Sequence, residues 1–407
     1  MFNIDGERLW ASLMEMSEVG RLPNGGCRRL ALSDEDRAAR DLFVRWSTEA
    51  GAEIRYDCFG NIFAIRAGTE PDRPIILTGS HLDTQPSGGH FDGVFGVLAG
   101  VEILRAMNEN NYRTNAPICV VNWTNEEGVR FAPGLTGSGG FAGRLKRETV
   151  LDLQATDGAT FGAELRRIGY GGESLSGELG FGAYIEAHIE QGPVLESGGK
   201  SIGIVSGVQG VRWYDLRISG AGRHAGTTPM SARSDAFMAA AALTASLRTM
   251  GLSLSEEIRL TFGRIEVLPG SPNTIPGCVS ASVDLRHPDE TVLTCFEEAM
   301  SSIVDTIAAA ENVSINWRRT MAVPAVAFDA RCIQILEQAT LDCGYEWENL
   351  TSGAMHDASS ISFVTPTAML FVPCRNGISH HESEWSEPED LTRGCEVLAK
   401  AVMQLAA

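Results

Sequence analysis

Two adjacent glutamates follow an apolar run in the stretch V-V-N-W-T-N-E-E-G-V-R-F, residues 120–131. Like charges repel each other, so Glu126 and Glu127 need either full hydration or a strongly positive partner. A solvated loop would meet the first condition. A bound metal cation would meet the second, and it would require further imidazole or carboxylate ligands from other parts of the chain.

Ligand-type side chains occur in four other segments. His81 and Asp83 lie two residues apart in an extended stretch, so both side chains leave the same face. The other candidates are Asp92 beyond a glycine-rich loop, His188 in A-H-I-E-Q-G, and the histidine pair of G-I-S-H-H-E, residues 377–382. A lone histidine or aspartate is more often a hydrogen-bonded loop residue. Together, the five segments predict a site for zinc or a similar divalent metal.

These segments need a scaffold that brings strand ends together. Residues 74–80 and 116–124 are nearly continuous apolar runs, as expected for central strands covered on both faces. Residues 93–111 between them have helical periodicity, which predicts a parallel α/β sheet. In such sheets ligands bind at the carboxyl ends of the strands, where His81 and the glutamates lie. The preceding segments 4–18 and 34–50 predict helices, and 53–68 predicts short strands.

The pattern changes near residue 208. Strands are predicted at 209–222, 258–270, 278–289 and 314–321, and helices at 231–251, with Gly251 as the stop, and at 289–311. A helix at 329–342 and a strand at 367–374 then resemble the first region again. The chain is therefore predicted to be an α/β catalytic domain, residues 1–207 and 324–407, interrupted by an α+β domain at 208–323.

Composition excludes several classes of protein. The 407 residues carry a net charge of −19 without a basic cluster, which argues against nucleic acid and anionic membranes as partners. No uncharged apolar stretch approaches the roughly 18 residues of a membrane span, and the acidic N-terminal segment lacks the features of a signal peptide. Nine scattered cysteines without a C-x-x-C pair argue against a disulfide framework. We therefore expect a cytoplasmic protein.

Several segments together resemble the M20 metallopeptidase-like amidohydrolases, in particular the branch of N-carbamoyl-L-amino-acid hydrolases and allantoate amidohydrolases. They are GSHLDTQPSGGHFDGVFGVLAG, VVNWTNEEGVRFAP, EAHIEQGPVLE, GRHAGTTPM, SPNTIPG, VDLRHPD, SGAMHDA and FVPCRNGISHHE, in order over almost the whole chain. The resemblance implies a di-zinc aminopeptidase-like catalytic domain with an inserted α+β lid and dimerisation domain.

The resemblance also implies roles for the ligand-type residues. Asp92 would bridge two Zn²⁺ ions per subunit, with His81 and His188 completing one site, and Glu127 and His380 the other. Asp83 would orient His81 through its second ring nitrogen, and Glu126 would be the general base beside the metal-bound water. The same ligand types also admit Mn²⁺, Co²⁺ or Ni²⁺.

Substrate contacts follow from the same resemblance. Arg286, which by itself could be an exposed strand residue, would hold the carboxylate of a small-molecule substrate. Gln191, Asn273 and the main chain of Ser352 and Gly353 would also contact it. His224 would reach the active site of a partner subunit and stabilise the oxyanion, so we expect a homodimer.

The implied reaction is hydrolysis of an amide or ureido C–N bond by a metal-bridging hydroxide. Bound Zn²⁺ lowers the pKa of water from about 15.7 to about 7, and a neighbouring carboxylate can move the proton to the leaving nitrogen. The expected conversion is N-carbamoyl-L-amino acid to L-amino acid, CO₂ and ammonia. The alternatives are allantoate hydrolysis, another N-acyl or amide substrate, and a non-catalytic metal-binding relative.

Four local features add detail to this interpretation. Met355 in SGAMHDA and His381 after His380 depart from the family pattern, so the pocket could differ and His381 could compete as a ligand. GKSIG at 199–203 matches a nucleophile motif, but its context predicts a β-turn rather than strand–turn–helix. GSGGFA at 137–142 mimics a dinucleotide loop and is predicted to be a plain glycine turn.

Overall fold

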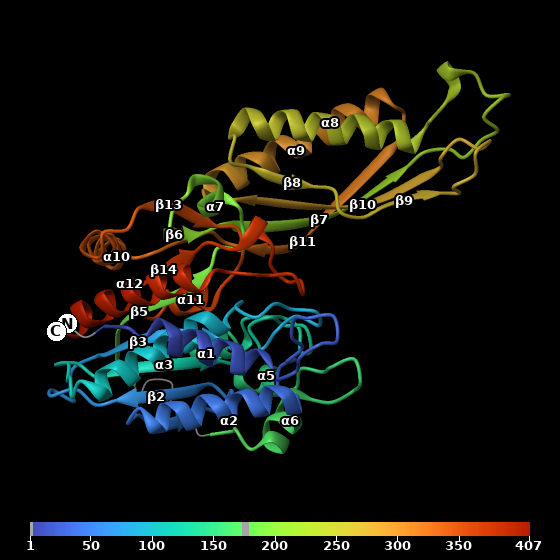
Figure 1. Cartoon of the computed structure of the whole chain (residues 1–407). Helices are drawn as coiled ribbons and strands as arrows, with labels where there is room; N and C mark the ends of the chain where they lie inside the picture. The colour runs from blue at the N-terminus through green and yellow to red at the C-terminus, as the bar shows by residue number, and fades with distance from the viewer. Residues whose placement is uncertain (1–2, 173–178) are drawn as a thin grey trace. The chain divides into compact units, whose positions relative to one another are not determined.

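The chain leaves one folded unit after Gly207, forms a second unit over Val208–Val326, and returns to the first over Ala327–Ala407 (Figure 1). We refer to these as unit 1 and unit 2. This computed structural model describes residues 3–172 and 179–407. Sequence analysis placed the two junctions at 207/208 and 323/324.

The apolar runs form the buried centre of a nine-stranded sheet in the described residues, with strand order β1-β2-β4-β3-β5-β14-β6-β12 and β13 paired to β6. Its central strands β3, β4, β5 and β14 are parallel neighbours, as the strand–helix–strand pattern predicted. The strands are β1 (Glu53–Tyr56), β2 (Ile62–Arg66), β3 (Ile75–His81), β4 (Ile118–Trp123), β5 (Phe181–Ile189), β6 (Ile202–Val208), β12 (Val326–Ala327), β13 (Trp347–Ser352) and β14 (Thr367–Val372).

Helices cover this sheet. The longest, α12, packs with α1, α3 and α10 and against β3, β5 and β14, so one hydrophobic core joins the early and late parts of the chain. The helices are α1 (Gly6–Ser17), α2 (Asp34–Glu49), α3 (Val94–Glu109), α4 (Thr136–Phe141), α5 (Arg147–Leu151), α6 (Phe161–Ile168), α7 (Val194–Gly198), α10 (Ala330–Cys343), α11 (Asp357–Ile361) and α12 (Pro388–Ala406), with a 3-10 turn at Arg375–Gly377.

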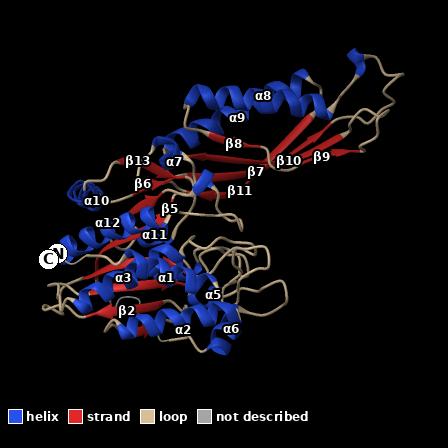
Figure 2. Cartoon of the chain, viewed as in Figure 1, coloured by secondary structure: helices blue, strands red, loops and turns tan. Residues whose placement is uncertain are grey.

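Unit 2 is an antiparallel five-stranded sheet with two long helices along one face (Figure 2). Its elements are β7 (Gly210–Ser219), α8 (Ala236–Leu254), β8 (Arg259–Thr261), β9 (Ile265–Leu268), β10 (Cys278–His287), α9 (Glu290–Ala310) and β11 (Ser314–Val323), with a 3-10 turn at Met230–Ala232. Strand β10 alternates regularly: Val279, Val283 and Leu285 are buried, and Ser282 and Asp284 are more exposed.

Three local predictions were wrong. Helix α8 continues past Gly251 to Leu254, because Gly251 does not take the positive φ of a helix-ending glycine; a Cβ there would lie 3.2 Å from the ring of Phe296. The strand predicted at 258–270 is two strands, β8 and β9, interrupted where Arg264 and Ser282 exchange hydrogen bonds. Residues 137–141 of the predicted glycine turn lie in the short helix α4, with Ala142 as its C-cap, and a Cβ at Gly137 would lie 2.2 Å from Asn61 Oδ1.

Two further features concern motifs and membranes. GKSIG runs from the end of α7 into β6, which is helix–turn–strand and therefore the reverse of a nucleophile elbow.

Among the described residues, one helix, α8, is long and apolar enough by length and composition to cross a membrane, although the sequence analysis expected none. In unit 2 this helix buries Leu243 and Leu247 on the core and exposes Phe237 and Met238.

Candidate metal centre

The ligand-type residues expected from the sequence gather at the carboxyl ends of the central strands. His81 is the last residue of β3, and His188 is the next to last residue of β5. Glu126 and Glu127 follow β4, and His380 follows β14 after one 3-10 turn. Because β3, β4, β5 and β14 are parallel neighbours, their carboxyl ends meet at one edge of the sheet.

In the described part of the chain, two groups of side chains could each hold a metal ion, and both contain Asp92. We call His81, Asp92 and His188 the inner group, and Asp92, Glu127 and His380 the outer group. Within each group the ligand atoms lie within 4.8 Å of one another. Asp92 Oδ1 is 3.2 Å from His188 Nε2, and Asp92 Oδ2 is 3.2 Å from His380 Nε2. Asp92 therefore turns one carboxylate oxygen toward each group, as a ligand shared by two cations would.

The two inner imidazoles are fixed by main-chain carbonyls. His81 Nδ1 lies 2.9 Å from the carbonyl oxygen of Asp83, and His188 Nδ1 lies 2.9 Å from that of Ile189. A ring nitrogen that donates to a carbonyl leaves Nε2 with the lone pair for a metal. Both Nε2 atoms face Asp92 Oδ1, at 3.7 Å from His81 and 3.2 Å from His188.

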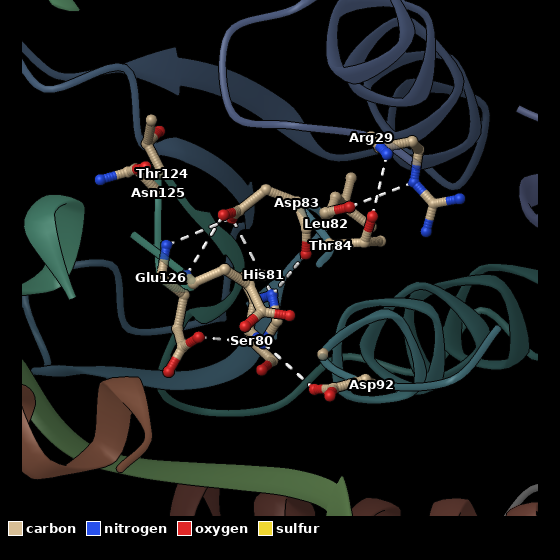
Figure 3. Close-up of polar contacts among 12 residues, drawn as sticks. Arg29, Ser80, His81, Leu82, Asp83, Thr84, Asp92, Thr124, Asn125 and Glu126 are labelled. Carbon is tan, nitrogen blue, oxygen red and sulfur yellow. Dashed lines mark hydrogen bonds and ion pairs between the residues drawn. The ribbon is translucent and has the colours of Figure 1, made fainter. Parts of the chain in front are cut away.

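The carboxylate of Asp83 contacts the turn that carries the two glutamates rather than the ring of His81. Its carboxylate lies 3.9 Å from His81 Nδ1, which is too far for a hydrogen bond. Instead it accepts the main-chain N–H of Glu126 (3.2 Å) and of Glu127 (3.3 Å) (Figure 3). Asp83 thus contacts His81 through its main-chain carbonyl, and its carboxylate fixes the turn that carries the two glutamates.

The charges of the site are poorly compensated by the protein. Burial and the repulsion of Glu127 raise the pKa of Glu126 well above its usual value. Burial and the charge of Asp92 raise the pKa of Glu127 to about 8. Buried like charges raise the cost of ionisation in this way unless a cation is close. A divalent cation would supply that charge, so the donor set fits a metal centre.

The three ligand histidines differ in protonation: His81 is neutral, whereas His188 and His380 share protons with Asp92. Burial lowers the pKa of His81 to about 4, which keeps its ring neutral and able to ligate. Burial alone would lower the pKa of His188, but the hydrogen bond and charge of Asp92 together with the charge of Glu186 raise it to about 9. The hydrogen bond to Asp92 raises the pKa of His380 to about 9 as well. A bound cation would replace these shared protons, because metal ligands must be deprotonated.

Unusual backbone conformations surround the site. The residues Asn125, Gln191 and His380 have backbone φ values of 59°, 57° and 56°, which residues other than glycine rarely adopt. Gly93 has φ of 68°, and a Cβ there would lie 2.4 Å from the ring of His81. The ligands are therefore presented by a backbone that the surrounding fold holds in place.

The expected substrate residues of unit 1 lie close to the ligands. Gln191 Nε2 donates to Asp92 Oδ2 (2.8 Å) and to Ser379 Oγ (3.0 Å), while its buried Oε1 has no hydrogen-bond partner. Ser352 Oγ is 3.0 Å from His356 Nε2, and the His356 ring packs edge-on against His188 with centroids 4.5 Å apart. Gly353 follows Ser352 at the surface.

Three expected substrate residues lie in unit 2. His224 and Asn273 are brought together there, because Ala225 N donates to the carbonyl oxygen of Asn273 at 2.9 Å. His224 is exposed, and its Nδ1 accepts the N–H of Gly226 at 3.1 Å. Arg286 makes a bidentate ion pair with Asp284, through Nε and Nη2 at 2.9 Å each.

The positions that depart from the family pattern also have defined surroundings. Met355 is 38% exposed. His381 lies outside both ligand groups, and its Nδ1 contacts Ser383 Oγ at 2.8 Å. The sequence reasoning missed His356, Ser379 and Glu384, which touch the ligands or their loops. Their signal was proximity in sequence, since Ser379 and Glu384 flank the histidine pair and His356 lies within SGAMHDA.

Comparisons with known proteins agree with this geometry. The model of peptidase family M20/M25/M40 matches residues 77–404. The N-carbamoyl-L-amino-acid amidohydrolase of Rhizobium meliloti is 40% identical over 99% of this chain and 97% of its own. The allantoate amidohydrolase of Bacillus subtilis is 32% identical over 96% of this chain and 95% of its own.

Among solved structures, an amidase of the hydantoinase/carbamoylase family from Burkholderia multivorans superposes with a TM-score of 0.96. It is 45% identical, and the match covers 100% of this chain and 98% of that one. The same five ligand-type segments that meet in unit 1 thus lie within a match that spans the whole chain. The chain belongs to the hydantoinase/carbamoylase branch of peptidase family M20/M25/M40.

Proposed function

We propose that this protein hydrolyses the C–N bond of N-carbamoyl-L-amino acids, releasing the L-amino acid, CO₂ and ammonia. The observation that carries the proposal is the pair of ligand groups that share Asp92, with Glu126 beside them and in neither. Three relatives named for this activity are 36–40% identical over nearly their whole length.

The proposed cofactor is a pair of Zn²⁺ ions per subunit. His81, Asp92 and His188 would hold one ion, and Asp92, Glu127 and His380 the other. Imidazole and carboxylate ligands suit zinc and also admit Mn²⁺, Co²⁺ or Ni²⁺. When bound, two such ions lower the pKa of a water molecule and polarise the substrate carbonyl.

Glu126 is proposed as the general base. Its Oε2 lies 3.7 Å from His81 Nε2, so the carboxylate borders the inner group without belonging to it. Asp83 holds its main chain, and burial raises its pKa, so its proton affinity is higher than that of an exposed glutamate. Glu126 would take a proton from the attacking water and deliver it to the leaving nitrogen.

Several polar groups are proposed to recognise the substrate. Arg286 would grip the substrate carboxylate, in competition with the bidentate contact from Asp284. Gln191 would offer its unpartnered Oε1 to a substrate N–H. Asn273 and the main chain of Ser352 and Gly353 would complete the contacts.

We propose that the active form is a homodimer in which His224 stabilises the oxyanion in the partner's site. Support comes from helix α8, which exposes Phe237, Met238 and Leu252 along unit 2. Exposed apolar side chains of this kind mark association surfaces. The nine cysteines are free thiols, in keeping with a cytoplasmic location, which we also propose.

The test is a substrate screen on metal-loaded enzyme. N-carbamoyl-L-amino acids, their D enantiomers, allantoate and N-acyl-L-amino acids are supplied separately, and ammonia and free amine are measured. We expect ammonia from the L-carbamoyl compounds with the highest kcat/KM. Full occupancy by two metal equivalents without turnover of any ureido or amide substrate would refute the proposal.

Allantoate is the second candidate substrate. Two allantoate amidohydrolases are 32% identical to this chain, somewhat less than the carbamoyl relatives. Both substrates present a ureido carbonyl and a carboxylate, so the same metal groups and Arg286 could serve either. A higher kcat/KM for allantoate than for every N-carbamoyl-L-amino acid would decide for this alternative.

A further inference from the structure

A buried glutamate outside both ligand groups joins the two loops that carry their ligands. Glu384 is 1% exposed, and its Oε1 accepts the main-chain N–H of Phe91 at 2.9 Å and of Asp92 at 3.1 Å. Its Oε2 accepts from Ser379 Oγ at 2.9 Å. One carboxylate therefore holds the backbone of the shared ligand Asp92 and the residue that precedes His380.

The packing around this carboxylate is tight. A Cβ at position 89 would lie 2.1 Å from Glu384 Cδ and Oε1, so only glycine fits where the loop before Asp92 passes it. The main chain of Glu384 also contacts the histidine pair, because Glu384 N donates to the carbonyl oxygen of His381 at 3.0 Å. Glu384 therefore contacts both loops.

The contacts of Ser379 extend this link to the ligand atom itself. Its hydroxyl lies 2.9 Å from both Glu384 Oε2 and Asp92 Oδ2, and it accepts from Gln191 Nε2 at 3.0 Å. A hydroxyl has one hydrogen to donate, so Glu384 and Asp92 share it. The orientation of Asp92 Oδ2, the oxygen that faces the outer group, is thus tied to Glu384.

We propose that Glu384 is a positioning residue for the outer group, which sets the distance between Asp92 and His380 without binding metal itself. The inference rests on the proposed metal-dependent function. The inner group depends less on this link, because it meets Glu384 only through the shared Asp92, whereas His81 and His188 are fixed by main-chain carbonyls and lie on strands. Loss of Glu384 should therefore weaken one metal ion selectively.

The test is titration of the protein with Co²⁺, followed by calorimetry and by the visible absorption of bound Co²⁺. For Glu384→Ala we expect the weaker of two binding events to lose about 10- to 100-fold in affinity, the usual cost of removing a supporting hydrogen bond at a metal site. The tighter event should change by less than about threefold, and kcat should fall more than KM rises.

Two variants make the result specific. Glu384→Gln keeps a carbonyl oxygen for both main-chain N–H groups and an amide for Ser379, so it should restore the outer affinity to within about threefold of the original. Glu102→Ala is the matched control: Glu102 is equally buried and accepts from Asp5 N (3.1 Å) and Arg8, but lies on α3 away from both groups. It should lower thermal stability and leave both Co²⁺ affinities unchanged.

Should Glu384→Ala fail to fold, a double-mutant cycle between Glu384→Leu, which fills the space but removes the acceptor oxygens, and Ser379→Ala decides. Linked residues give non-additive effects on the outer affinity, by a factor of about three or more. Additive effects, or an Ala variant that binds both Co²⁺ equivalents like the original protein, would overturn the inference. An original protein that binds two Co²⁺ ions but turns over no substrate would refute the proposed function and leave this inference standing.

Discussion

The inner and outer ligand groups share Asp92 and the same ligand chemistry, yet they differ in their contact with solvent. The side chains of His81 and His188 are 2% and 1% exposed, whereas that of His380 is 50% exposed. The inner imidazoles come from β-strands, and His380 comes from a loop with positive φ. One half of the centre is therefore built into the core, and the other half faces the solvent.

This difference suggests that the two ligand groups have different functions. A closed ligand set with fixed tautomers is suited to holding an ion permanently, whereas a catalytic metal needs an open position for water and substrate. The outer group has that opening. Its ligands are held by side-chain hydrogen bonds: Gln85 Nε2 donates to Glu127 Oε2 at 2.5 Å, and Ser379 Oγ donates to Asp92 Oδ2 at 2.9 Å. We therefore expect the two halves to respond differently to the same perturbation.

The largest expected effect comes from a residue that belongs to neither half. Glu126→Gln removes the proposed base and should lower kcat on the order of 10³-fold, the usual range for general-base catalysis. Both metal equivalents should stay bound, which elemental analysis after gel filtration would show. Glu127→Gln is the comparison variant and should lose the outer equivalent first. Identical behaviour of the two variants would remove the distinction between base and ligand.

Substituting one histidine in each group tests the comparison directly. His188→Ala should lose the inner ion and also cost about 2–4 kcal/mol in the free energy of unfolding, because a buried ring that packs on His356 is removed. His380→Ala should lose the outer ion while the metal-free variant unfolds at nearly the original denaturant concentration. Metal analysis and urea unfolding measure both quantities, and equal destabilisation by the two substitutions would contradict the inner–outer distinction.

A chelator should remove the ions of the two ligand groups at different rates. An ion bound partly by the exposed His380 can leave without opening the core, whereas release from His81 and His188 requires local unfolding. We expect two phases of metal loss with rates at least about tenfold apart, and loss of turnover with the first phase. Release of both equivalents in a single phase would show that the groups form one cooperative site.

Much of this architecture could be predicted from the sequence. The apolar runs at 74–80 and 116–124 are the buried parallel strands β3 and β4, because continuous apolar runs indicate strands covered on both faces. Ligand-type residues at strand ends were predicted to converge, because parallel strands place their carboxyl ends at one edge. The exact roles of such residues depend on hydrogen bonds that sequence spacing does not specify.

What the sequence could not indicate are contacts between distant loops and choices between main chain and side chain. Asp83 contacts the second ring nitrogen of His81 through its main-chain carbonyl, while its carboxylate holds the glutamate turn, and the spacing does not specify this choice. Glu384 is separated by 292 residues from Asp92, whose N–H it accepts. Gly251 followed the pattern of a helix stop, but it does not take the positive φ of a helix-ending glycine, and α8 continues past it.

The smallest expected effect concerns His381, which stands beside His380 and could in principle replace it. His380 Nε2 lies 3.2 Å from Asp92 Oδ2 and 3.7 Å from Glu127 Oε2, whereas the His381 ring contacts Ser383 and Glu382. His381→Ala should therefore change Co²⁺ affinity and kcat by less than about threefold, because only an exposed contact is lost. His380→Ala in the same titration is its matched comparison. A loss of the outer ion in the His381 variant would mean that the two neighbouring imidazoles exchange roles, and the outer group would then be defined by its loop rather than by one histidine.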